Sequence, residues 1–286
     1  MVDTYVINLK HEKENYYNVK NKLKNKNFEK IYRFNGIYGK KIKNLDNYDH
    51  YLTSLFKNIG PFGAIGSALS HYTLLDSIYN SKKYKKDEYV LILEDDVTPN
   101  FDYKELLKVV EEAPNNCDIL VLHSFQGLIK YKEKFNEDYI FKNSVSLSAP
   151  CCSYLIKVDS IPKFTKIKIW NYFDVMHFNC NIISSSNIYI YKKQFFSTDY
   201  TISHNLNSKK LLYKFLKILC TYFNFPDFIF FFLFKCVRIP IFNIELSTID
   251  IVNLLVTIII LIIFFYSIII IKIYNIIHKI IKILIK

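Results

Sequence analysis

A run of 21 residues without a charged side chain, Ile251–Ile271, constrains this chain more than any other feature. Seventeen of the 21 are Ile, Leu, Val or Phe. At ~1.5 Å of rise per residue, a helix of this length spans about 31 Å, which matches a bilayer core of roughly 30 Å. The run therefore predicts a transmembrane helix over residues 248–272, with a buried core helix as the alternative.

The segments that flank this run are basic and amphipathic. Residues 206–247 contain a helical pattern, Ser208–Phe223, in which an apolar stripe faces lysines, followed by the apolar run Phe228–Phe234. Residues 273–286 mix paired isoleucines with lysines. Both patterns are typical of helices that lie at lipid headgroups, although the first also fits an ordinary core-packed helix.

We expect residues 1–205 to form a separate folded domain. The N-terminus lacks a basic region followed by a long apolar run, so it does not resemble a secretory signal. A single-pass C-terminal anchor with the large domain in the cytosol is the expected topology. The four lysines that follow the run favour the opposite orientation of the tail, but translocating a short tail is the smaller task.

Composition excludes some classes of protein. The chain has 24 Phe, 23 Tyr and 51% hydrophobic residues, which excludes intrinsic disorder. The net charge of +12 suits nucleic acid, an anionic membrane or a phosphorylated substrate without choosing among them. None of the six cysteines forms a CxxC pair, so a zinc ribbon is unsupported. Adjacent Cys151 and Cys152 suggest a metal pair or, more simply, small residues in a packed strand.

Short apolar runs alternate with helical periodicity in the first half of the chain. Strands are expected at residues 5–9, 31–34, 89–93 and 118–122, and helices at residues 12–27, 64–79 and 105–112. The run at 89–93 shows almost no polar alternation, as in strands covered on both faces. This order predicts an α/β fold with an open, mostly parallel sheet and helices on both faces.

Three adjacent acids, Glu94-Asp95-Asp96, directly follow the apolar run at 89–93. In open α/β sheets, ligands bind beyond the C-terminal ends of the strands. Carboxylates there suit a hard divalent cation, which bridges to a diphosphate and neutralises charge on a leaving group. Alternation along an extended chain turns Glu94 and Asp96 to one side and Asp95 to the other. The simpler alternative is a solvated strand end that caps the next helix.

A second segment, Gly60–His71, places glycines at the start of a helix, where backbone N–H groups can approach a phosphate. It matches neither GxGxxG nor a P-loop, and His71 also fits a half-buried core residue. Lysines and Arg33 crowd residues 20–43. That stretch favours a solvated face or attraction to anionic lipid over nucleic-acid binding.

Several ordered segments together resemble glycosyltransferase family 25, the lipooligosaccharide-biosynthesis and procollagen galactosyltransferase group. They are Tyr5–Lys10, Phe34-Asn35-Gly36, Gly63–His71 and Val90–Val97. The resemblance covers residues 3–125 well and extends weakly towards residue 205. It implies a GT-A fold (Rossmann-like), a nucleotide-sugar donor such as a UDP-sugar, and a divalent metal, Mn²⁺ or Mg²⁺.

The resemblance also implies roles for individual residues. The metal ligands are expected to be Asp96, Asp95 and His204, and the catalytic residues Asp95 and Asp174, with Asp174 as base for the acceptor hydroxyl. Donor contacts are expected from Asn8, Gly66, Ser70, His71 and Glu94. Two departures stand out: Ser67 replaces a usual Cys, and Ile161-Pro162 interrupts an expected helix.

We therefore expect transfer of a hexose, galactose or glucose, to a hydroxyl of a glycan, a lipid-linked glycan or a protein. One alternative is a non-catalytic membrane-anchored scaffold with a degenerate transferase domain. Another is a basic nucleic-acid-binding membrane protein, which would show salt-dependent oligonucleotide binding.

Overall fold

A computed structural model describes residues 1–122, 133–134, 140–142, 152–170, 173, 186–191, 193–198, 236–239 and 244–247. The chain divides into two compact units, Met1–Phe231 and Phe232–Lys286. In the second unit, β11 (Cys236–Ile239) and β12 (Ile244–Ser247) pair as an antiparallel hairpin. The predicted membrane-spanning run lies outside the described residues.

Within the described ranges, no helix is both long and apolar enough to span a membrane.

The first unit is built on an eight-stranded sheet with the order β2-β1-β3-β8-β5-β9-β7-β6. Its strands are β1 (Asp3–Leu9), β2 (Ile31–Gly36), β3 (Tyr89–Glu94), β5 (Ile119–Val121), β6 (Glu133–Lys134), β7 (Ile140–Lys142), β8 (Ser153–Lys157) and β9 (Ile188–Tyr191). A separate antiparallel ribbon joins β4 (Val97–Pro99) to β10 (Phe196–Thr198).

The sheet is mixed. Strands β2, β1 and β3 are parallel neighbours, as are β5 and β9. Strand β8 lies between β3 and β5 and is antiparallel to both, and β7 is antiparallel to β9. The α/β class and the parallel arrangement of the first three strands are confirmed. The antiparallel β8 was not predicted, because a strand buried on both faces has the same apolar pattern in either direction.

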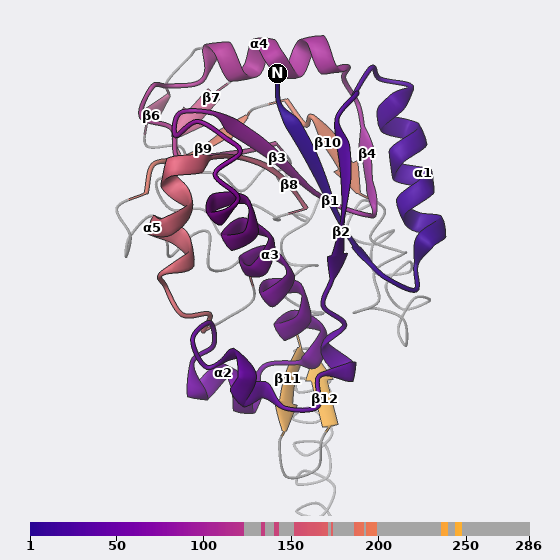
Figure 1. Cartoon of the computed structure of the whole chain (residues 1–286), viewed down its shortest axis with the longest axis vertical. Coiled ribbons are helices and arrows are strands. Elements are labelled where there is room, and N and C mark those ends of the chain that lie inside the picture. Colours follow the sequence, from indigo (N-terminus) through magenta and orange to yellow (C-terminus); the bar gives the residue numbers. More distant parts are fainter. Residues whose placement is uncertain are drawn as a thin grey trace, which may run out of the picture. The chain divides into compact units, whose positions relative to one another are not determined.

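Helices cover both faces of this sheet, as predicted (Figure 1). Helices α1 (Lys13–Lys24) and α4 (Tyr103–Glu112) pack on one face, and α3 (Phe62–Asn80) and α5 (Ile161–Thr165) on the other. Shorter helices are α2 (Ser54–Ile59), η1 (Gly39–Lys41), η2 (Leu45–Tyr48) and η3 (Val158–Ser160). Successive residues of β3 explain its apolar pattern: Ile92 packs on the α3 side, whereas Leu91 packs on the α1 side.

Two local predictions are corrected. Helix α1 ends at Lys24, because Asn27 adopts a left-handed backbone with φ 63°, which ends a helix and which Asn tolerates. The pair Ile161-Pro162 does not interrupt a helix but begins α5. Proline is accepted in a first helical turn because the N–H that it lacks has no intrahelical partner there.

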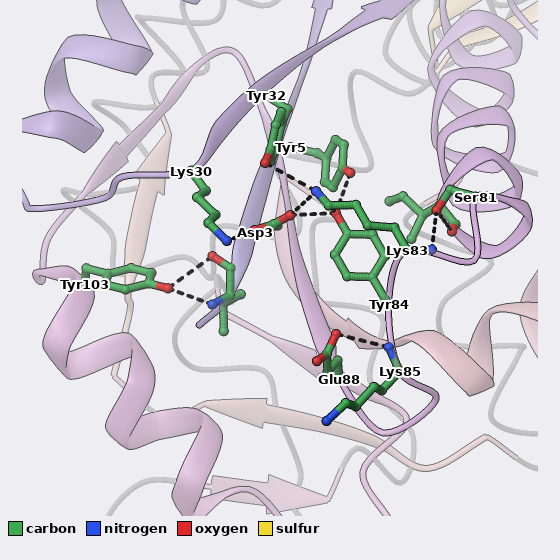
Figure 2. A network of polar contacts seen from close by, with 12 residues as sticks. Asp3, Tyr5, Lys30, Tyr32, Ser81, Lys83, Tyr84, Lys85, Glu88 and Tyr103 are labelled. Atoms are coloured by element: carbon green, nitrogen blue, oxygen red, sulfur yellow. Dashed lines mark hydrogen bonds and ion pairs between the residues drawn. The ribbon is translucent and has the colours of Figure 1, made fainter.

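A polar network fixes the N-terminal end of β1 (Figure 2). Asp3 is buried and accepts hydrogen bonds from Lys83 Nζ at 2.5 Å and Tyr84 OH at 2.7 Å, with Lys30 Nζ 3.8 Å away. Burial by itself raises the pKa of Asp3, but these hydrogen bonds and the lysine charges outweigh it and lower the pKa. The segment after α3 is thereby tied to β1.

Candidate functional site

Three adjacent parallel strands end at the same edge of the sheet. In register, Asn8 of β1 lies beside Asn35 of β2, and Ile7 lies beside Glu94 of β3. The turn that follows β3 carries Asp95 and Asp96. The predicted site residues Asn8, Glu94, Asp95 and Asp96 therefore meet at the strand ends, where open α/β sheets bind their ligands.

Asp95 is held by the end of β1. The buried amide of Asn8 donates from Nδ2 to Asp95 Oδ2 at 2.5 Å and to the backbone oxygen of Glu12 at 2.8 Å. Desolvation by burial raises the pKa of Asp95 to about 6. The hydrogen bond from Asn8 lowers this pKa, whereas the negative charges of Glu94 and Glu12 raise it further. The carboxyl of Asp95 therefore gains or loses its proton at a pH closer to neutral than an ordinary aspartate does.

Arg33 of β2 belongs to this site, although the sequence pattern placed it in a solvated basic stretch. Its Nε and Nη2 donate to Asn8 Oδ1 at 2.9 and 2.5 Å, and Nη2 also donates to the backbone oxygen of Leu9 at 3.1 Å. The guanidinium lies 5.3 Å from the ring centroid of Tyr16 on α1. Arg33 lies two strands away from the acids that follow β3, and nothing in the local sequence around it indicated a place in the site.

Glu94 turns towards the opposite face, as strand alternation predicted. Its Oε1 lies 3.2 Å from Nε2 of His71 on α3, and His71 Nδ1 lies 2.9 Å from the hydroxyl of Tyr154 on β8. The side chain of His71 is 1% exposed and that of Glu94 is 34% exposed. His71 is therefore buried behind Glu94 and contacts its carboxylate. A direct contact between His71 and a donor stays a prediction.

Phe173 packs against the ring of His71. The two rings stack with centroids 4.0 Å apart and planes inclined by 12°. Phe173 is itself buried and also contacts Tyr154 and Phe164. The residue that precedes Asp174 is thus fixed in the layer that supports Glu94. Asp174 and His204 lie outside the described residues, so their predicted roles stay predictions.

Gly66 and Ser70 position α3 against the loop that follows β2. A Cβ on Gly66 would lie 2.6 Å from both the backbone nitrogen of Gly39 and the backbone oxygen of Ile37. Ser70 Oγ donates to the oxygen of Gly66 at 2.6 Å and accepts from the nitrogen of Ile37 at 2.7 Å. Both residues are buried in a packing role, and their predicted donor contacts stay predictions.

The acids suit a divalent metal by their chemistry. Across the described parts of the chain, no group of three or more His, Cys, Asp or Glu side chains is placed to hold an ion. Such a cage is not required, because Mg²⁺ at phosphate sites uses one or two carboxylates together with the phosphates of the substrate. Asp95 and Asp96, whose Oδ1 is buried, provide such carboxylates. Cys152 is buried, and Cys151 lies outside the described residues.

Comparisons with known proteins identify the family. Solved structures that match part of this chain include the crystal structure of A197 from STIV, at 13% identity over 66% of this chain and 81% of that chain, with a TM-score of 0.38. The apo crystal structure of mouse xyloside xylosyltransferase 1 matches at 8% identity over 57% and 68%, with a TM-score of 0.30. A comparison with curated proteins found no match.

The family model of glycosyltransferase family 25 (LPS biosynthesis protein) matches residues 1–205, which are more than half of the chain. These residues include the strand ends and the α3 segment that carried the sequence resemblance, so that prediction is confirmed. The chain therefore belongs to glycosyltransferase family 25 and is a glycosyltransferase.

Proposed function

We propose that this enzyme transfers a hexose, galactose or glucose, from a UDP-sugar to a hydroxyl of a glycan, a lipid-linked glycan or a protein. The proposal rests on one observation above all: Asn8, Glu94 and Asp95 converge at the strand ends of a family 25 domain. Both acids are already held by other side chains, Glu94 by His71 and Asp95 by Asn8. Such preorganisation avoids reorganising charge during the reaction.

A divalent metal, Mn²⁺ or Mg²⁺, is part of the proposal, with Asp96 and Asp95 as its protein ligands. When bound, it would neutralise charge on the diphosphate leaving group. Glu94 is proposed as a contact to the donor, and the support for this role is that His71 Nε2 lies 3.2 Å from Glu94 Oε1 and holds the carboxylate in position.

Asp174 is the proposed base that accepts the proton of the acceptor hydroxyl. What supports it is the position of Phe173, the preceding residue, which stacks on His71 at 4.0 Å while His71 contacts Glu94. A general base must lie within hydrogen-bond reach of its proton.

The test measures hydrolysis of UDP- and GDP-sugars by the full-length protein with manganese present. Asp96→Asn keeps the shape of the side chain and removes its charge, so we expect turnover to fall by roughly 10²–10³-fold, the usual loss for one charge-stabilising group. Asp87→Asn is the matched control, because exposed Asp87 lies before the opposite end of the same strand, β3.

Full activity in Asp96→Asn would contradict the role given to the carboxylates. A wild-type protein that hydrolyses none of the donors and binds no nucleoside diphosphate in the presence of metal would instead favour the non-catalytic scaffold.

We also propose that residues 248–272 anchor the enzyme in a membrane and that residues 206–247 hold its domain against the lipid surface. The support is the uncharged run Ile251–Ile271 and the basic amphipathic pattern before it. Carbonate should leave the full-length protein in the membrane and should extract a chain that ends at Asp250. Release of the full-length protein by carbonate would contradict the anchor.

A further inference from the structure

Three side chains form a continuous line across the ends of the three parallel strands. Arg33 on β2 donates to Asn8 on β1 through Nε at 2.9 Å and Nη2 at 2.5 Å, and Asn8 Nδ2 donates to Asp95, after β3, at 2.5 Å. The guanidinium of Arg33 thus reaches Asp95 only through the amide of Asn8. Asn8 is 1% exposed, so the middle of this line is shielded from water, whereas Arg33 and Asp95 at its ends are half-buried.

The two ends of the Asn8 amide are distinguished by their partners. A guanidinium only donates hydrogen bonds, so the atom that faces Arg33 must be Oδ1. The backbone oxygen of Glu12 only accepts, so the atom 2.8 Å from it must be Nδ2. The same Nδ2 faces Asp95. If the amide flipped, its oxygen would face a carboxylate oxygen and a carbonyl oxygen, and all three are acceptors.

Arg33 is itself held in place. Its guanidinium lies over the ring of Tyr16, which is 7% exposed, at 5.3 Å from the centroid. Its Nη2 also donates to the backbone oxygens of Leu9 at 3.1 Å and Lys10 at 3.3 Å. The planar guanidinium is already fixed on the aromatic ring, so it loses little conformational freedom when it donates to Asn8, which suits a positioning role.

We propose that Arg33 is a positioning residue of the donor site. It fixes the amide of Asn8 in the one orientation that donates to Asp95, and so holds that carboxylate in place for the metal and the diphosphate. The inference rests on the proposed function for the use of Asp95, but the orientation of Asn8 can be measured without it.

The first test measures the manganese concentration needed for half-maximal donor hydrolysis. Arg33→Met should raise it by about 10–100-fold, the usual loss when a group that orients a metal ligand is removed. Arg33→Lys keeps one donor and should restore part of the loss. The matched control is Lys20→Met. Lys20 Nζ also lies over the Tyr16 ring, 5.7 Å from its centroid, but it makes no hydrogen bond to Asn8 in the described structure.

A double-mutant cycle separates action through Asn8 from a general loss of structure. If Arg33 acts through Asn8, Arg33→Met should add no further loss in an Asn8→Ala background. Additive losses, or a rise in the manganese requirement equal to that of Lys20→Met, would overturn the proposal.

The second test does not depend on activity. The side-chain NH₂ signals of Asn8 in the ¹⁵N-labelled full-length protein, assigned by their absence in Asn8→Ala, should shift in Arg33→Met and stay unchanged in Lys20→Met. If the wild-type enzyme turned over no donor, the proposed function would fail while a shifted amide signal would still support the positioning role. An unchanged Asn8 signal in Arg33→Met would overturn it.

Discussion

The substitution Asp95→Asn should make the protein more stable at neutral pH while it removes activity. Burial raises the pKa of Asp95 to about 6 from its ordinary value of 3.8, so ionising this carboxyl costs folding free energy. Each pKa unit corresponds to about 1.4 kcal/mol, which sets an upper value of about 3 kcal/mol above pH 6. Asparagine carries no charge, and its side-chain oxygen can still accept the hydrogen bond from Asn8 Nδ2.

The sign of the pH dependence follows from proton binding. Between pH 3.8 and about 6 the folded state holds the proton on Asp95 and the unfolded state has lost it, so the contribution of Asp95 to wild-type stability falls as pH rises. Below pH 3.8 the carboxyl is protonated in both states, and the advantage of Asp95→Asn should vanish. It should be largest above pH 6.

Thermal melting of the full-length protein in EDTA at several pH values measures this difference. An advantage of about 1–3 kcal/mol would raise Tm by roughly 2–10 °C for a domain of this size. Asp87→Asn is the control, because Asp87 is exposed. Equal stability of Asp95→Asn and wild type at pH 7, or an advantage that does not change with pH, would refute the reasoning that Asp95 is desolvated.

Two further substitutions test the packing around the site and the base of the sheet. Gly66→Ala should lower Tm, because the added Cβ would lie 2.6 Å from backbone atoms of Gly39 and Ile37. Overpacking costs about 1–3 kcal/mol, which exceeds the gain of up to ~1 kcal/mol in helix propensity. An unchanged or higher Tm would contradict this contact. Asp3→Asn should make the free energy of unfolding fall less steeply as the pH drops below about 4. The pKa of Asp3 is lowered in the folded state, so its carboxylate stabilises the fold at higher pH, and this stability is lost as the pH falls through the folded-state pKa. Urea unfolding at pH 3 and 7 measures the change, and equal pH dependence in both proteins would contradict the network.

Much of the candidate site could be predicted because its residues follow one another in the sequence. Glu94-Asp95-Asp96 directly follow a buried strand, so these acids were expected at the strand ends, where open α/β sheets bind ligands. Asn8 was expected in the site from the family resemblance, and it is found beside Asp95. The periodicities of the helices and strands gave the α/β class and the covered faces of the sheet, because burial on both faces leaves no polar alternation.

The features that could not be predicted from the sequence depend on contacts between residues that are far apart in the chain. Nothing in the local pattern places Arg33 beside Asn8, 25 positions away, or Tyr154 beside His71, 83 positions away. The direction of β8 depends on which neighbours it pairs with, and its apolar pattern is the same either way.

Local sequence thus determined the main strands and helices of residues 1–122 and which acids end a strand, because these depend on side chains within a few residues of one another. Only the tertiary structure decided that Arg33 contacts Asn8, that His71 contacts Glu94 and that the loop after β2 packs directly against Gly66. Those roles depend on distances of a few ångströms between separate elements, which are set when the elements pack together.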